Sequence, residues 1–370
     1  MSLFKAASTV SLLTLVSRVT GLVREQLIAA SFGASAATDA FNVAFRLPNL
    51  FRRLFAEGAF SQAFVPLLAA TREREGDVAT RALIDAVATV LAWALLLTCV
   101  LGVAGAPVLV WIIGSGLERF DTAVVLTRWM FPYIGFMSMV ALAAGILNTW
   151  KRFAVPAVTP VLLNLSVIAA AWWGAPRLAG AGIDPIHALA GGVMLGGVLQ
   201  AAVQIPALAA IGALPRIGLL PGAIARAWRH PGVGRVLRQM APALLGVSVA
   251  QISLLINTQI ASHVAVGAVS WLTYADRLME FPTALLGVAL GVVLLPQLSA
   301  AQARRPHQFE QVVFLILYQP IDAVEGHPAV APRLSGQPVH RVIAVLQRAP
   351  AVGEKRAVQG HVRIERHIHR

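Results

Sequence analysis

Apolar runs long enough to cross a lipid bilayer recur from residue 5 to residue 302 of this chain. A helix needs about 20 mainly apolar residues to cross roughly 30 Å of hydrocarbon. The chain is 57% hydrophobic and 13% charged, so a soluble fold would expose too much apolar surface. We therefore predict an all-α integral membrane protein. Pro and Gly positions divide the runs into eight predicted membrane helices, at about 5–31, 36–70, 81–113, 121–148, 154–176, 185–212, 237–262 and 267–302.

These helices suggest four regions along the chain. Residues 1–212 form an N-terminal transmembrane lobe of six helices, and residues 237–303 form a partial second lobe of two helices. Between them lies a basic segment, residues 213–236, in which arginines alternate with Trp228 and aliphatic residues. An interfacial helix on the cytoplasmic leaflet and a plain basic linker both fit that segment. Residues 304–370 are rich in His, Pro and Arg, contain no run that can span, and are predicted to be a disordered tail.

The loop charges predict the orientation. With a cytoplasmic N-terminus, the outer loops carry mainly Arg119 and Arg177, whereas the inner loops carry most of the cations. Cytoplasmic loops are enriched in Lys and Arg, so we expect this orientation. The inner set is Arg72, Arg74, Arg81, Lys151, Arg152, Arg216, Arg226, Arg229, Arg235, Arg238, Arg304 and Arg305.

Five arginines lie within the first two apolar runs. They are Arg18, Arg24, Arg46, Arg52 and Arg53. An arginine at the bilayer centre costs roughly 2.5–3.5 kcal/mol on the insertion scale, so these side chains are not expected to face lipid. They are expected to face water, partner groups or an anion.

The second predicted helix carries a polar stripe. Asn42, Arg46, Asn49 and Arg53 follow at spacings of four, three and four, which places them on one helix face. Asp39 and Glu57 lie at the two ends of the stripe and are expected to neutralise part of its charge.

A cationic cavity in a membrane predicts an anionic cargo. The guanidinium group donates two parallel hydrogen bonds to phosphate or carboxylate and stays charged in a low-dielectric pocket. The alternative for Arg46, Arg52 and Arg53 is that they reach an interface or pair with Asp39 and Glu57.

Signatures of catalysis are absent from the sequence. It contains no HExxH, GxSxG or P-loop pattern, and no aromatic-plus-basic or zinc-finger pattern typical of nucleic-acid binding. We therefore expect no enzymatic activity, no cofactor, no metal and no nucleic-acid partner. The small-residue pattern Gly192-x-x-x-Gly196 is a weak indication of close helix packing.

Five sequence runs resemble the MurJ/MviN lipid II flippases of the multidrug/oligosaccharidyl-lipid/polysaccharide exporter superfamily. The longest is ATDAFNVAFRLPNLFRRLFAEGAFSQAFVP, from Ala37 to Pro66. The others are SRVTGLVRE (Ser17 to Glu25), GILNTWKRFAVPA (Gly145 to Ala157), GVSVAQISLLINT (Gly246 to Thr258) and SWLTYADRLMEFP (Ser270 to Pro282). The resemblance covers about residues 1–303.

The resemblance implies a function and a set of site residues. Members of that family move the undecaprenyl-pyrophosphate-linked peptidoglycan precursor from the inner to the outer leaflet of the bacterial cytoplasmic membrane by alternating access. It implies substrate-binding roles for Arg18, Arg24, Arg52, Arg277 and Ser17, and charge-balancing or gating roles for Asp39 and Glu57. Within this sequence Arg46 and Arg53 join that second group, and Glu280 joins it as a helical neighbour of Arg277. Expected partners are the lipid-linked precursor, membrane lipids and cell-wall synthesis proteins.

The resemblance ends where the sequence changes character. Family members carry a complete second lobe, whereas the pattern here stops near Arg304, which suggests a truncated or frame-shifted chain. Two further functions therefore stay open: a non-transporting fragment that binds the precursor, and an exporter of another polyprenyl-linked glycan.

Overall fold

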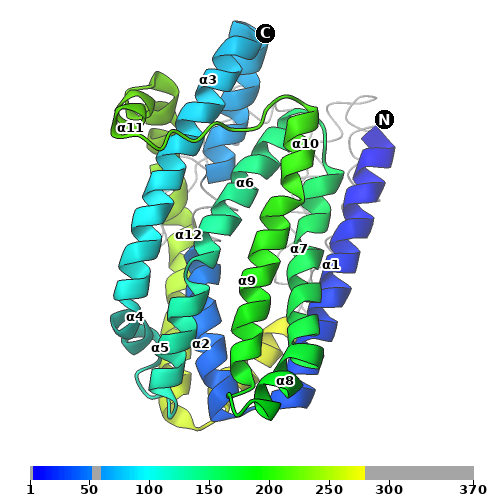
Figure 1. Cartoon of the computed structure of the whole chain (residues 1–370), viewed down its shortest axis with the longest axis vertical. Coiled ribbons are helices and arrows are strands. Elements are labelled where there is room, and N and C mark those ends of the chain that lie inside the picture. Colours follow the sequence, from blue (N-terminus) through cyan, green and yellow to red (C-terminus); the bar gives the residue numbers. More distant parts are fainter. Residues whose placement is uncertain (1–2, 52–59, 280–370) are drawn as a thin grey trace, which may run out of the picture. The chain divides into compact units, whose positions relative to one another are not determined.

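The computed structural model describes residues 3–51 and 60–279, and within these ranges all regular structure is helical (Figure 1). Residues 268–279 are also helical. The expected tail lies outside the described residues. The named elements are α1 (Leu3–Phe32), α2 (Ala36–Phe51), α3 (Phe60–Ala104), α4 (Ala106–Gly114), α5 (Phe120–Met130), α6 (Tyr133–Thr149), α7 (Ala154–Ala169), the π-helical η2 (Ala170–Gly174), α8 (Ala175–Gly180), α9 (Ile186–Ala202), α10 (Gln204–Ala210), α11 (Pro221–Trp228) and α12 (Pro231–Val264).

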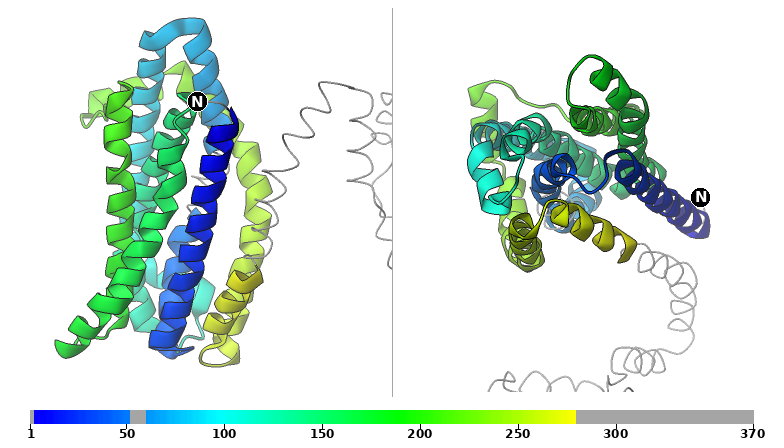
Figure 2. Two further views of the ribbon diagram at one scale, coloured as in Figure 1. Left: turned by 90° about the vertical axis from the view of Figure 1, so that its right-hand side faces the viewer. Right: turned by 90° about the horizontal axis from the view of Figure 1, so that it is seen from below.

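Long helices pack side by side and position the walls of one cavity. α7 packs between α1 and α9, while α3 packs against both α6 and α12. One apolar core joins α3 and α6 to the start of α12, and a second joins α2, α5, α6 and α9. Seen from below in Figure 2, the helical residues 268–279 run alongside α2.

Some predicted helix boundaries agree with the structure and others differ from it. The predicted break between helices 36–70 and 81–113 is present: α3 changes direction within it at Gly76, whose φ of 80° lies in the left-handed region that favours glycine (Figure 2). The predicted 121–148 helix is divided at Phe131, between α5 and α6. α12 begins at Pro231 rather than residue 237, because the His230 side chain accepts a hydrogen bond from the backbone N–H of Gly232 and proline suits the first helical turn.

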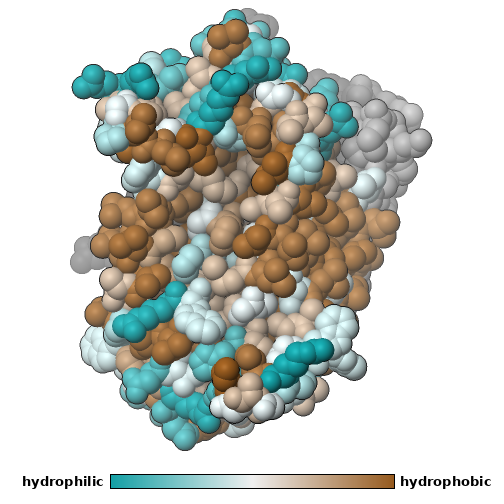
Figure 3. Space-filling view, in the orientation of Figure 1, coloured by the Kyte–Doolittle hydropathy of each residue, from teal (hydrophilic) through white to brown (hydrophobic). Residues whose placement is uncertain are grey.

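Four helical stretches among the described residues are long and apolar enough to span a membrane, compared with the eight we predicted. They are Phe60–Ala104, Phe120–Thr149, Ala154–Gly180 and Ile186–Ala210. α1, α2 and α12 are outside this set, and all three contribute polar side chains to the cavity. On the face shown in Figure 3, apolar side chains fill a broad middle zone and hydrophilic side chains gather at both ends. Trp111, Leu101 and Trp172 are among the exposed apolar residues.

The glycine pattern on α9 lies against α7. A Cβ on Gly192 would come within 2.6 Å of the Ala170 Cβ and 3.0 Å of the Ser166 carbonyl oxygen. A Cβ on Gly196 would lie 3.0 Å from the Cα of Leu163. The structure therefore confirms the predicted close packing at these two glycines.

Gly192→Ala is expected to lower the melting temperature of the detergent-solubilised protein, because backbone atoms of α7 must move to admit the methyl group. Overpacking of this kind costs about 1–3 kcal/mol. The adjacent Gly191→Ala is a matched control, since its Cβ meets nothing within 4 Å and alanine favours a helix. Equal melting temperatures for the two variants would contradict the packing account.

Candidate functional site

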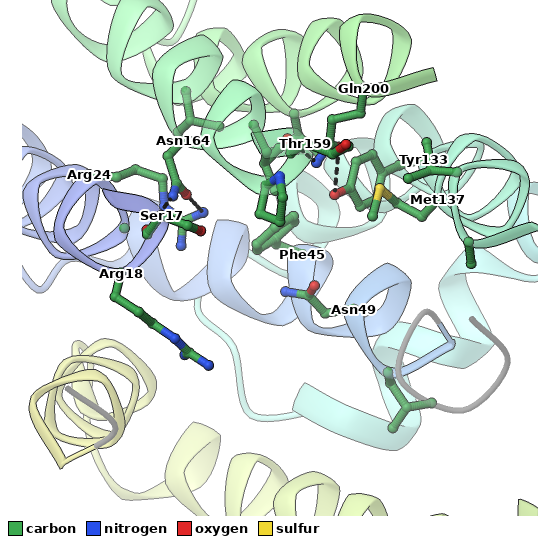
Figure 4. A pocket seen from close by; sticks show the side chains of 18 of the residues that line it. Ser17, Arg18, Arg24, Phe45, Asn49, Tyr133, Met137, Thr159, Asn164 and Gln200 are labelled. Carbon is green, nitrogen blue, oxygen red and sulfur yellow. Dashed lines mark hydrogen bonds between the residues drawn. The ribbon is translucent and has the colours of Figure 1, made fainter. Parts of the chain in front are cut away.

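A cavity of about 1300 Å³ lies between α1, α2, α3, α6, α7, α9, α10, α12 and the helical residues 268–279 (Figure 4). Its described wall includes four arginines and two acidic residues, an excess of two positive charges. Neutral amides and hydroxyls make up most of the other polar groups. The polar lining residues are Thr14, Ser17, Arg18, Arg24, Glu25, Asn42, Arg46, Asn49, Ser61, Tyr133, Asn148, Thr159, Asn164, Gln200, Gln204, Gln251, Thr273, Asp276 and Arg277.

Arg24 is the centre of a buried polar cluster. The side chain is only 7% exposed, and its Nη1 donates to Asn164 Oδ1 at 3.0 Å. Its Nη2 forms an ion pair with Glu25, whose side chain is 10% exposed. The guanidinium carbon lies 5.9 Å from the centre of the Phe45 ring. These contacts fix the guanidinium group at the cavity wall, because each neighbour restricts its orientation.

Arg277 reaches the same cluster from a distant part of the sequence. Its Nε lies 3.6 Å from Glu25 Oε1, so Glu25 contacts two guanidinium groups. One carboxylate between two arginines leaves the cluster with one positive charge in excess. The structure thereby brings Arg24 and Arg277, two of the expected substrate-binding residues, to one side of the cavity.

Ser17 and Arg18 lie along α1 from this cluster. The Ser17 backbone carbonyl accepts a hydrogen bond from Asn164 Nδ2 at 3.0 Å. Arg18 is exposed, and in Figure 4 its side chain extends from α1 in a direction away from Asn164. Both residues line the cavity.

The polar stripe on α2 joins that helix to the later ones. Asn42 donates to Ser270 Oγ at 3.2 Å, and Asn49 lines the cavity. Arg46 donates to the Thr258 hydroxyl, to the Leu254 carbonyl at 3.4 Å and to Thr273 Oγ1 at 3.3 Å. These three acceptors of Arg46 are neutral oxygens, and Glu57, one of the two acidic residues expected to balance its charge, lies outside the described residues.

Asp39 binds backbone groups at the start of the helical residues 268–279. The residue is 3% exposed and accepts hydrogen bonds from the N–H of Gly267 at 2.6 Å, the N–H of Ser270 at 2.8 Å and the hydroxyl of Ser270 at 2.6 Å. This geometry is that of a helix cap supplied by another helix. The carboxylate of Asp39 therefore caps a helix N-terminus, a role that the sequence spacing did not indicate.

Four of the expected site residues lie outside the described residues: Arg52, Arg53, Glu57 and Glu280. Five described site residues were not predicted from the sequence. They are Glu25, the hydroxyl-bearing Thr159, and the amide-bearing Asn164, Gln200 and Gln204. The signal that indicates them is the presence of polar residues in predicted spans, and it applies to Asn164 and Gln200 as it does to Arg24.

Comparisons with known proteins agree with this architecture. A family model described as Lipid II flippase MurJ matches residues 28–317. The chain is 60% identical over 305 residues to a lipid II flippase MurJ of Burkholderia cenocepacia, covering 81% of this chain and 58% of the relative. It is 42% identical over 311 residues to a probable lipid II flippase MurJ of Vibrio cholerae, covering 80% of this chain and 57% of the relative.

A solved structure has the same fold. The structure titled "Lipid II flippase MurJ, inward closed conformation" matches with a TM-score of 0.64 and 26% identity, over 80% of this chain and 59% of that one. This chain spans less than two thirds of the length of the relatives it matches. The matched residues include the cavity-forming helices from Ile28 onward. This multi-pass bacterial membrane protein therefore belongs to the MurJ lipid II flippase family.

Proposed function

We propose that this chain acts as a lipid II flippase and that its cavity binds the pyrophosphate of an undecaprenyl-linked peptidoglycan precursor. The observation that carries the proposal is the cationic excess of the cavity wall, with Arg24 and Arg277 converging on one buried carboxylate. Arg18 adds a further guanidinium group on the same helix as Arg24. Guanidinium groups match phosphate oxygens in geometry and keep their charge away from water.

The remaining site residues have supporting roles in this proposal. Ser17 lies beside Arg18 and adds a hydroxyl to the cavity wall. Arg52 is proposed to extend the cationic wall, and Arg53, Glu57 and Glu280 to balance charge, as the family resemblance and helical spacing imply. The lipid tail of the cargo stays in the bilayer while the charged head group occupies the cavity.

Contacts between helices that the sequence assigns to different lobes support a proposed alternating-access cycle. Asp39 and Asn42 on α2 bind Gly267 and Ser270, and Tyr274 donates to the Gly33 carbonyl at 3.2 Å. These contacts hold one end of the helices together. Their separation, with closure at the other end, moves the cavity opening from one leaflet to the other.

The proposed location is the bacterial cytoplasmic membrane, with the N-terminus in the cytoplasm. α1 begins at the end of the molecule where α11 lies (Figure 1), and Arg226 and Arg229 on and beside α11 are exposed. The interhelical turns at the other end carry Arg119, which pairs with Asp184 at 2.5 Å. Cytoplasmic loops are enriched in Lys and Arg, and exposed Trp228 with Arg226 and Arg229 suits an interfacial position for α11.

The direct test is binding of undecaprenyl pyrophosphate by the purified chain, before and after Arg18→Ala. Loss of a charged hydrogen bond costs about 1.5–3 kcal/mol, so the dissociation constant is expected to rise roughly ten- to a hundredfold. Arg128→Ala is the matched control, because Arg128 is exposed and is not among the residues that line the cavity.

A cell depleted of its own flippase tests transport separately from binding. Growth restored by the wild-type chain and not by Arg18→Ala supports the flippase. Binding without restored growth favours the precursor-binding fragment, and tighter binding of a different polyprenyl-linked glycan favours an exporter of that glycan. Failure to bind undecaprenyl pyrophosphate would refute the proposal.

A further inference from the structure

A second polar group in the cavity contains no charge. Gln200 and Gln204 are each 1% exposed, and Thr159 is 2% exposed, yet all three line the cavity. Gln200 Nε2 donates to the Thr159 carbonyl at 3.0 Å, and Gln204 Nε2 lies 3.4 Å from Thr159 Oγ1. Tyr133 donates its hydroxyl to Gln200 Oε1 at 3.4 Å. We call Thr159, Gln200 and Gln204 the amide shelf.

The amide shelf has unused hydrogen-bonding capacity. Gln204 Oε1 is buried and has no hydrogen-bond partner among the residues that the structure describes. Burying a polar atom without a hydrogen-bond partner destabilises the fold by about 1–3 kcal/mol. Such an atom in a native structure therefore calls for an explanation. A ligand group that donates to this oxygen would supply the missing bond.

The shelf lies at a fixed distance from the cationic cluster. Thr159 and Asn164 are both on α7, and five residues of helix rise about 7.5 Å along the axis. Asn164 binds Arg24, so along the α7 axis the shelf is offset by about that rise from the contact with Arg24. In Figure 4, Thr159, Gln200 and Tyr133 form one group, and Arg24, Ser17 and Asn164 form another.

We infer that the amide shelf binds the saccharide part of the cargo, through its hydroxyl and acetamido groups. This inference rests on the proposed function, because it assumes that the arginines hold the pyrophosphate. The sugar is bonded directly to the pyrophosphate and must lie in the adjoining part of the cavity. Neutral amides donate and accept hydrogen bonds without attracting a second anion, which suits an uncharged sugar.

The test compares two ligands that share the lipid and the pyrophosphate. One is undecaprenyl pyrophosphate, and the other is undecaprenyl pyrophosphate carrying the disaccharide of the precursor. Gln204→Met and Gln200→Met remove the amide while keeping an unbranched side chain of similar length. Each is expected to weaken binding of the disaccharide ligand by about tenfold and to leave binding of undecaprenyl pyrophosphate unchanged.

Leu199→Met is the matched control, because Leu199 is adjacent to Gln200 but 40% exposed. Thr159→Val, which exchanges a hydroxyl for a methyl group, serves as a second variant in case a glutamine variant fails to fold. Equal weakening of both ligands, or no weakening of either, would overturn the shelf assignment alone. A wild-type chain that binds neither ligand would overturn the proposed function and the shelf together.

Discussion

Arg24→Met is expected to abolish measurable binding of undecaprenyl pyrophosphate and also to destabilise the fold. The substitution removes a guanidinium group from the proposed phosphate site. It also leaves the buried carboxylate of Glu25 without its closer partner, since Arg277 lies 3.6 Å away. Breaking a buried ion pair by removing one partner costs about 3–5 kcal/mol. Ligand titration and denaturant unfolding in detergent measure the two effects.

The double variant Arg24→Met/Glu25→Met separates stability from binding. Removing both charges eliminates the unpaired carboxylate, so most of the lost free energy of unfolding is expected to return. Binding is not expected to return, because the guanidinium group is still absent. Recovery of binding in the double variant would show that Arg24 acts only by neutralising Glu25, and it would refute direct phosphate binding by Arg24.

The helical class and the break around Gly76 were predictable from the sequence, whereas the π-helical turn was not. Hydrophobic length and the polar stretch between two predicted spans indicated a break between residues 70 and 81, and α3 changes direction there, at Gly76. The π-helical turn at Ala170–Gly174 lies in a run that reads as an uninterrupted apolar helix. A local departure from α-helical geometry of this kind depends on packing against neighbouring helices, and the sequence of a single span does not show that packing.

The cationic part of the site was predictable because a buried arginine is costly on its own. The energetic argument selected five arginines, of which Arg18, Arg24 and Arg46 line the cavity, while Arg52 and Arg53 lie outside the described residues. Their partners were not predictable: Asn164 meets Arg24 across 140 positions of sequence. An asparagine within a span costs less than an arginine, so its presence alone does not identify its partner.

The partners of the acidic residue Asp39 were also not predictable from the sequence. Sequence spacing placed it on the α2 stripe and suggested a charge-balancing role. Its observed hydrogen bonds run to Gly267 and Ser270, which lie 228 and 231 positions away in the sequence and which the spacing could not indicate. A carboxylate can satisfy a local cation or a distant helix N-terminus, and only the fold determines which of these it meets.

Asp39→Ala is expected to release the helical residues 268–279 from α2. Three buried donors lose their acceptor, and the helix start loses its cap, for a combined cost of about 2–4 kcal/mol. Hydrogen–deuterium exchange of the peptide around Ser270 measures the release as faster exchange. Asp121→Ala is the control, because Asp121 is an exposed carboxylate in the first turn of α5.

Asp39→Asn gives a graded version of the same test. Asparagine keeps one oxygen for Ser270 but turns an amide NH₂ toward the N–H of Gly267, where Asp39 presents its second oxygen. An intermediate exchange rate is therefore expected. Exchange in Asp39→Asn equal to that of the wild type would contradict the need for two acceptor oxygens. In the proposed transport cycle, the contact between α2 and residues 268–279 must break when the cavity changes sides. A weaker cap is therefore also expected to favour the state in which α2 and residues 268–279 are apart.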